Sequence, residues 1–132
     1  MRYLLDTHVI IWMTMAPDRL PESLRQRLTW PAAQLFVSAA SAMEIATKVR
    51  IGKLEAAKQL TEEHSWDQML RDYRAIELPI SLRHSLLAGS LDWQHRDPFD
   101  RFLAAQSILD DLPLVTADRD FAGLTGLTTL WE

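Results

Sequence analysis

The sequence predicts an α/β fold in which helices cover a mainly parallel sheet of four or five strands. Short apolar segments suited to buried strands alternate with longer segments of helical spacing, and this alternation is typical of parallel sheets with crossover helices. The 132 residues and the 48% apolar content are ordinary for one packed domain. We therefore expect residues 1–132 to form a single domain.

The first strand is predicted at residues 3–5, which are apolar and suited to burial on both faces of a parallel sheet. The apolar run continues at residues 9–13, where we expect a helix. A second helix is predicted over residues 21–28, with proline at its first helical position and leucines four residues apart. Pro31 is expected to end it.

Residues 34–38 are predicted to be a second buried strand. Ser41 is expected to cap a helix that ends near Gly52. The apolar face predicted for this helix consists of Met43, Ile45, Ala46, Val49 and Ile51. Residues 55–74 are expected to form two helices with a break near Ser65, and their buried stripe is predicted to be Leu60, Trp66, Met69, Leu70 and Tyr73.

The third strand is predicted at residues 75–78, before a helix over residues 81–91. The buried face of that helix is expected to be Leu82, Leu86, Leu87 and Leu91. An aspartate followed by proline starts a long helix over residues 97–111. Residues 112–116 form the fourth predicted strand, and residues 128–131 form a fifth at an edge of the sheet.

The composition excludes several classes of protein. The absence of cysteine excludes disulfides, thiolate nucleophiles and Cys-ligated zinc, and it fits a reducing compartment. A net charge of −4 argues against a domain that holds nucleic acid mainly by electrostatic attraction, although it does not exclude a nuclease with a metal pocket. No apolar run approaches the roughly 20 residues of a membrane span, and no signal-peptide pattern is present. We expect a soluble, cytoplasmic protein with no membrane partner.

Four acidic residues stand where predicted strands or helices begin or end: Asp6, Glu44, Asp100 and Asp118. Ligands of open parallel sheets bind beyond the carboxyl ends of the strands, so the fold can bring these residues together. Two unit charges about 4 Å apart repel by about 4 kcal/mol at an effective dielectric constant near 20, so such a cluster needs cations or hydrogen-bond donors. Oxygen ligands favour Mg²⁺ or Mn²⁺, which support hydrolysis of a phosphodiester.

Each of these acids also has a purely structural interpretation. Asp118 can cap a helix, and Asp100 gains from the helix dipole near a helix N-terminus whatever its function. Glu44 and Lys48 lie four residues apart and can form an exposed ion pair worth about 0.3 kcal/mol. The position of Asp6 directly after a buried strand favours a functional site, although an aspartate in a turn would also occupy such a position.

Four segments carry motifs in a recognisable order: YLLDTH at 3–8, SAASAMEIA at 38–46, HRDPFDR at 95–101 and TADRDF at 116–121. Together with Lys48, GKL at 52–54 and AAQ at 104–106, they closely resemble the PIN-domain nucleases, specifically the VapC toxins of bacterial type II toxin–antitoxin modules. Each motif alone is weak, but the ordered set covers nearly the whole chain. One departure is Met43, at a position where this subgroup often has tryptophan.

The resemblance implies a three-layer α/β/α sandwich, an endoribonuclease that depends on Mg²⁺ or Mn²⁺, and a homodimer inhibited by a cognate antitoxin. By motif, it makes Asp6, Glu44, Asp100 and Asp118 the catalytic acids. Asp6 and Asp100 are expected to bind metal directly, and the other two partly through water. The supporting residues that it implies are Thr116, Asp97 and Asp120. Thr116 is expected to orient a carboxylate or water, and the two aspartates are expected to act mainly as caps.

Basic residues and histidines beside these acids have two interpretations. Arg96 and Arg119 are the first candidates to bind RNA phosphates, ahead of four other basic residues, Lys48, Arg50, Lys53 and Arg101. Solvated faces and ion pairs are the alternative. His8 and His95 are expected to be hydrogen-bonded structural residues rather than ligands.

Two other classes of function are compatible with the acids. A receiver-like regulatory domain would accept a phosphate on an aspartate beside Mg²⁺, but it should carry a lysine after a late strand, and only Thr116-Ala117-Asp118-Arg119 follows the fourth strand. A non-catalytic binding module would use its acids to hold a basic peptide. The RNA target and the number of metal ions are not predicted.

Overall fold

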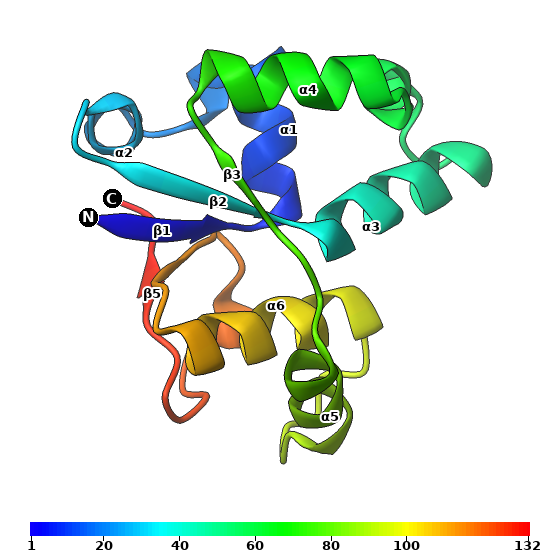
Figure 1. Cartoon of the computed structure of the whole chain (residues 1–132), viewed down its shortest axis with the longest axis vertical. Helices are drawn as coiled ribbons and strands as arrows, with labels where there is room; N and C mark the ends of the chain where they lie inside the picture. The colour runs from blue at the N-terminus through cyan, green and yellow to red at the C-terminus, as the bar shows by residue number, and fades with distance from the viewer.

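A computed structural model describes residues 1–132 and contains one sheet of five parallel strands (Figure 1). The strands are β1 (Arg2–Leu5), β2 (Gln34–Ser38), β3 (Ile76–Leu78), β4 (Leu114–Val115) and β5 (Thr129–Leu130). Their order across the sheet is β3-β2-β1-β4-β5. The predicted α/β fold with a parallel sheet is confirmed, and β5 lies at an edge as expected.

Six α-helices and three short 3₁₀ segments connect the strands. The α-helices are α1 (Thr7–Met15), α2 (Glu22–Thr29), α3 (Ala39–Arg50), α4 (Glu63–Asp72), α5 (Leu82–Ser90) and α6 (Pro98–Asp110). The 3₁₀ segments are η1 (Pro17–Arg19), η2 (Glu55–Thr61) and η3 (Arg119–Phe121). Helices α1, α2 and α4 lie on one side of the sheet, and α5 and α6 lie on the other (Figure 1). None of the helices is long and apolar enough to cross a membrane.

The central strand β1 supplies side chains to both faces of the sheet. Tyr3 and Leu5 belong to a core cluster with residues of α1 and α2, whereas Leu4 belongs to a second cluster with Leu103 of α6. This division follows from the two-residue repeat of a strand, which points successive side chains to opposite faces. A strand buried on both faces needs a continuous apolar segment, as the sequence of β1 has.

The strand order places a crevice at the carboxyl end of β1. From β1 the chain goes to β2 on one side, and β4 returns to the other side of β1. The connection after β1 and the connection after β4 therefore run to opposite sides along the sheet. Ligands of open α/β sheets bind at such a point. Asp6 follows β1 directly, and Thr116 follows β4 directly.

Two details of α3 differ from prediction. The helix begins three residues earlier than expected, because the hydroxyl of Ser38 accepts a hydrogen bond from the amide of Ala40 and caps the helix. Ser41 therefore lies inside the helix, fully buried, and its hydroxyl is hydrogen-bonded to that of Thr7. Met43 and Ile51, predicted on the apolar face, are exposed.

The predicted buried face of α5 is wrong in part: Leu91 packs against a core cluster and Leu87 is half-buried, but the other two leucines are exposed. Leu82 and Leu86 are 83% and 74% exposed, and the residues that α5 buries are His84 and Ala88. His84 is buried because its ring accepts a hydrogen bond from the amide of Ser81 and contacts Asp110 of α6 at 2.9 Å. The inner face of α5 therefore carries a polar residue with two hydrogen-bond partners where a leucine was expected. The spacing of hydrophobic residues does not reveal such a position.

Two smaller boundaries also differ. The break within residues 55–74 falls at Glu62, between η2 and α4, rather than near Ser65. Pro21 is the N-cap of α2 rather than its first helical residue.

Candidate functional site

Asp6 is held rigidly at the carboxyl end of β1. Its side chain is buried, and one oxygen accepts a hydrogen bond of 2.6 Å from the amide of Thr7, which begins α1. The other oxygen accepts a bond of 2.7 Å from the hydroxyl of Thr116. Thr116 therefore orients a carboxylate, which is one of the two roles that the family resemblance implied. These donors compensate part of the cost of burying the charge.

His8 has a structural role beside Asp6. Its Nε2 accepts a hydrogen bond from the amide of Ala117, so its Nδ1 carries the proton and lies 3.3 Å from Asp6 Oδ2. The ring also makes an edge contact with Trp12. An imidazole that accepts a hydrogen bond through one nitrogen is neutral. This bond ties the loop after β4 to α1.

Glu44 lies in α3 and is 5% exposed. Its Oε2 accepts a hydrogen bond of 2.6 Å from Lys48 Nζ. Its Oε1 is buried and has no hydrogen-bond partner. The predicted i, i+4 ion pair exists, but its acidic member is buried rather than exposed.

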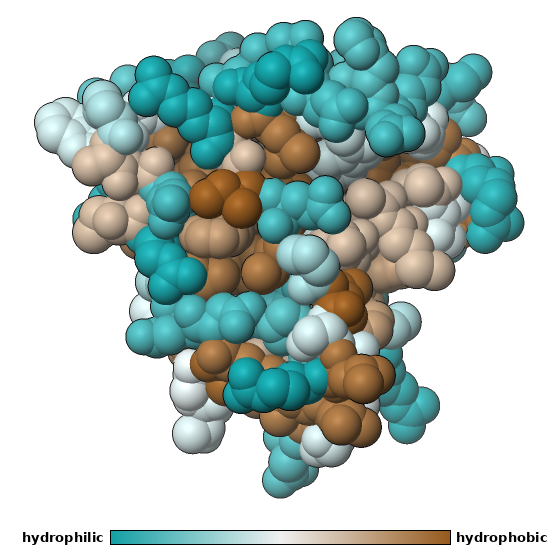
Figure 2. All heavy atoms as spheres, viewed as in Figure 1, coloured by the Kyte–Doolittle hydropathy of each residue, from teal (hydrophilic) through white to brown (hydrophobic).

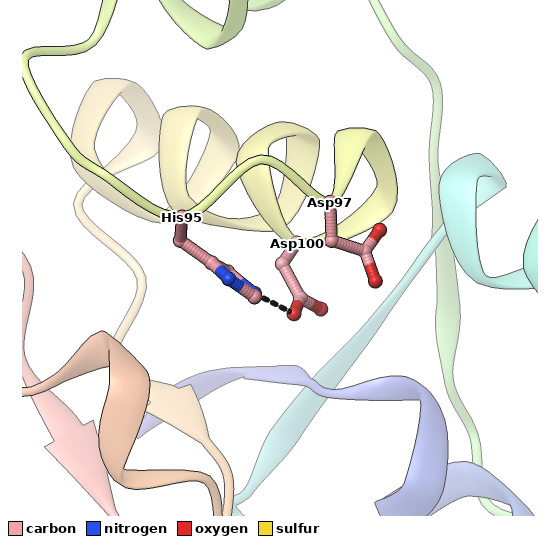
Figure 3. A group of neighbouring side chains, drawn as sticks. All are labelled: His95, Asp97 and Asp100. Carbon is pink, nitrogen blue, oxygen red and sulfur yellow. Dashed lines mark hydrogen bonds and ion pairs between the residues drawn. The ribbon is translucent and has the colours of Figure 1, made fainter.

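Asp97 and Asp100 project from the start of α6 toward the same space as His95 (Figure 3). One ligand atom from each of these three residues lies within 4.8 Å of the others. His95 Nε2 lies 2.5 Å from Asp100 Oδ2. Asp97 also caps α6, because its Oδ1 accepts a hydrogen bond from the amide of Phe99. Asp97 therefore combines the expected cap with a place in the acidic group, and His95 is hydrogen-bonded beside the acids, as expected.

The acids influence one another electrostatically. Burial, together with the charges of Asp6, Asp97 and Glu44, raises the pKa of Asp100 to about 7, although the hydrogen bond from His95 opposes the rise. That same hydrogen bond is the main cause of the raised pKa of His95. The charges of Asp6, Glu44 and Asp97 all act on Asp100, so the fold brings acids from distant parts of the sequence close to one another. We call this group of carboxylates the acidic pocket.

Lys48 supplies positive charge at this pocket. Partial burial lowers its pKa, but the hydrogen bond and charge of Glu44, with the charges of Asp97 and Asp100, outweigh that effect and raise the pKa overall. The ammonium group is therefore charged at neutral pH.

The pocket has the chemistry of a divalent-cation site. Carboxylate oxygens are its main ligands, and such a set favours Mg²⁺ or Mn²⁺. The unpartnered Oε1 of Glu44 and the raised pKa of Asp100 both indicate negative charge that the protein's own donors leave uncompensated. A hard cation would satisfy both, so the residues present fit such an ion.

Asp118 is attached to the site through its backbone. Its amide donates a hydrogen bond of 2.9 Å to the hydroxyl of Thr116, which in turn contacts Asp6. Its Oδ1 accepts from the amide of Asp120 and caps η3. Asp118 is half-buried, and Asp120 is exposed. Asp120 also lines an open hollow of about 580 Å³ with Asp92, Trp93, Gln94 and His95.

The basic residues have different surroundings. Arg96 and Arg119 are exposed beside the acids, so their side chains are accessible to a ligand. Arg101 instead donates hydrogen bonds of 2.7–3.0 Å to four backbone carbonyls, those of Ala88, Leu91, Trp93 and His95. Its guanidinium fixes the loop that carries His95, so it is structural rather than a phosphate ligand.

Gln106 is a supporting residue to which no role was given from the sequence, although it lies within the AAQ segment at 104–106. It is fully buried; its Oε1 accepts a hydrogen bond of 2.5 Å from Ser38, and its Nε2 donates to the carbonyl of Pro79. It thereby joins α6 to the ends of β2 and β3. A polar residue within an otherwise apolar helical run, Ala104-Ala105-Gln106-Ser107, is the signal that could have revealed it.

Comparison with known proteins gives one family. Residues 3–127 match the family model described as PIN domain. No match is found among curated proteins.

Three solved structures illustrate the likeness of the fold. VapBC2 from Rickettsia felis, bound to a DNA fragment from its promoter, aligns with a TM-score of 0.72 and 18% identity over 100% of each chain. DNA-bound VapBC from Salmonella typhimurium aligns with a TM-score of 0.71 and 20% identity over 98% of this chain and 97% of that one. A toxin–antitoxin complex from Klebsiella pneumoniae aligns with a TM-score of 0.67 and 24% identity over 96% of each chain. At these identities the likeness concerns the fold alone.

Proposed function

The chain belongs to the PIN domain family, and on that premise we propose that it is a divalent-metal-dependent endoribonuclease, the VapC-type toxin of a type II toxin–antitoxin system. PIN domains of VapC toxins are nucleases. The observation that carries the proposal is the convergence of buried acids from β1, α3 and α6, which raises the pKa of Asp100 to about 7. Such a concentration of negative charge is costly unless a cation offsets it.

Asp6 and Asp100 would hold the ion directly, with Glu44 and Asp118 acting partly through water. A bound Mg²⁺ or Mn²⁺ ion supplies an activated water and stabilises charge on phosphoryl oxygens. Thr116 keeps the Asp6 carboxylate in one orientation through its hydrogen bond. The exposed guanidinium groups of Arg96 and Arg119 would hold the RNA backbone on either side of the cut. Side chains that are already held in their reactive orientation need not reorganise during the reaction.

RNA cleavage by the purified chain tests this proposal. We expect cleavage with Mg²⁺ or Mn²⁺, none with EDTA, and at least a hundredfold loss in Asp100→Asn, because an amide is a poor ligand for a hard cation. The matched control is Asp67→Asn, the same change at an exposed aspartate of α4. Undiminished cleavage by Asp100→Asn in protein that has no contaminating nuclease would reject the assignment.

We also propose that a cognate antitoxin inhibits the chain. The structures from Rickettsia felis, Salmonella typhimurium and Klebsiella pneumoniae are toxin–antitoxin complexes of the same fold. This chain has a hollow of about 360 Å³ on the helical face opposite α6, and Met13, Leu20, Leu28 and Tyr73 are among the residues that line it. The chain should arrest growth when expressed alone, and co-expression of a small antitoxin reading frame found beside its gene should relieve that arrest and yield a stable complex. Growth arrest that persists despite its expression would count against this partner.

A homodimer and a cytoplasmic location complete the proposal. Apolar side chains gather on the surface over α3 and α5 (Figure 2). The exposed large ones there include Met43, Leu82 and Leu86, and exposed apolar patches mark interfaces. Light scattering should give twice the monomer mass of 15.2 kDa. Leu86→Glu should reduce that mass to the monomer's, and a monomeric wild-type chain would refute the dimer.

A further inference from the structure

The pair between Glu44 and Lys48 differs from an ordinary ion pair on a helix surface. The side chain of Glu44 is 7% exposed, whereas that of Lys48 is 43% exposed, and their charged atoms lie 2.6 Å apart. One end of the pair therefore lies inside the pocket, and the other reaches its rim. Lys48 has a flexible four-carbon stem, so its ammonium can move without moving the helix.

Lys48 satisfies only part of the negative charge that it faces. Glu44 Oε1 is buried and has no partner. Asp97 and Asp100 act on the Lys48 ammonium from α6, in addition to Glu44 from its own helix. A single ammonium against three carboxylates leaves the pocket negative. The ammonium and an arriving divalent cation would thus compete for the same carboxylate oxygens.

We propose that Lys48 is a built-in counter-ion of the acidic pocket, which neutralises Glu44 while the pocket holds no metal and contacts the phosphate backbone of bound RNA once a metal ion has displaced it. The second half rests on the proposed nuclease function. The Lys48 side chain is 43% exposed while its ammonium contacts Glu44, so a phosphodiester oxygen that comes to these acids from solvent falls within its reach. An ammonium released from Glu44 finds there the negative group that it pairs with best.

The proposal makes two opposite predictions for one substitution. Lys48→Met removes the charge and keeps an unbranched side chain of similar length. Metal binding should become tighter, because no internal cation competes, by about tenfold on a Coulomb estimate for charges several ångströms apart near the surface. RNA cleavage should become slower, because the phosphate loses a partner. A residue with only a structural role would weaken both.

Isothermal titration of the chain with Mn²⁺ decides the first half. Lys48→Met and Lys48→Gln should bind Mn²⁺ several-fold more tightly than wild type, and Lys48→Arg should stay within about threefold of wild type. The control is Lys58→Met, the same change at an exposed lysine of η2, which should leave the affinity unchanged. Unchanged or weaker Mn²⁺ binding in both uncharged variants would overturn the counter-ion assignment.

Single-turnover cleavage at saturating Mn²⁺ decides the second half. We expect a tenfold or greater loss in Lys48→Met, substantial recovery in Lys48→Arg and no loss in Lys58→Met. Tighter Mn²⁺ binding with cleavage as fast as wild type would reject the phosphate contact. If wild type cleaves no RNA, the nuclease proposal and the phosphate contact fail together, whereas the Mn²⁺ titration still decides the counter-ion.

Discussion

Replacement of Asp100 by asparagine should stabilise the metal-free protein while abolishing its activity. The side chain is 13% exposed and lies among other carboxylates, and its pKa rises from 3.8 to about 7 on folding. Because the folded state holds the proton more tightly than the unfolded state, ionisation destabilises the fold. That destabilisation is absent below pH 4, grows as the pH rises from about 4 to about 7, and is complete above pH 7. The asparagine side chain of the variant carries no such charge.

The size of the effect follows from the shift. A displacement of about 3 pKa units corresponds to about 4 kcal/mol at pH 8, which is an upper limit because solvent screens part of the repulsion. That shift already includes the opposing hydrogen bond from His95. We therefore expect a gain of at most about 4 kcal/mol at pH 8 and little difference near pH 4, where Asp100 is protonated in the folded state.

Urea denaturation in EDTA, followed by the fluorescence of the five tryptophans, measures this difference at several pH values. Addition of Mg²⁺ at about 100 times its dissociation constant should then stabilise wild type by about 2.7 kcal/mol and leave the variant nearly unchanged. Asp67→Asn serves as the control and should follow wild type throughout. A variant that is less stable than wild type at pH 8 in EDTA, or a difference that does not grow with pH, would refute the electrostatic reasoning.

Three further substitutions test how the site is supported. Thr116→Val removes the hydroxyl that donates to Asp6. It should lower the free energy of unfolding, measured by urea denaturation, by about 1–3 kcal/mol, and it should slow cleavage. An unaltered cleavage rate would show that Asp6 needs no such support. Arg101→Met leaves four carbonyls unpaired. It should lower the free energy of unfolding by about 3 kcal/mol or more and speed amide exchange in residues 91–95. Slow exchange there would contradict the role given to Arg101. Leu4→Ala, at a fully buried position of β1, should cost about 2–5 kcal/mol in urea, and a cost below about 1 kcal/mol would mean that the sheet is not buried on both faces.

Strands β1 and β2 could be predicted from the sequence because most of their residues are buried. The predicted range 34–38 coincides with β2, and β1 differs from its predicted range by one residue at its start. A short apolar segment followed by a polar residue is a local signal, so it needs no knowledge of the rest of the fold. The acids that follow β1 and begin α6 could be identified as candidates for the same reason.

The helix faces were predicted less well, because the spacing of leucines does not say which face meets the sheet. Leu82 and Leu86 have helical spacing yet point to solvent, while His84 is buried through partners contributed by Ser81 and Asp110. Arg101 was likewise grouped with phosphate ligands, since nothing in its neighbours shows that four carbonyls surround it. Contacts of this kind depend on how separate segments pack, which a local pattern does not encode.

The sequence could nominate the acids of the site but not their arrangement. The charges of Asp6 and Glu44 act on Asp100, whereas the carboxylate of Asp118 caps η3 and is linked to Asp6 through its backbone and Thr116. The part played by His95 beside Asp100 depends on the loop that Arg101 holds. That residues 1–132 form a single domain stays a prediction, as do the roles assigned to the individual acids.

A crystal of the chain soaked in Mn²⁺, with the ion located by its anomalous scattering, tests the central claim most directly. Convergence of Asp6, Glu44 and Asp100 on a hard divalent ion predicts a strong peak within about 2.5 Å of the carboxylate oxygens of Asp6 and Asp100. The absence of any peak among these carboxylates at millimolar Mn²⁺, with Lys48 still in contact with Glu44, would contradict it.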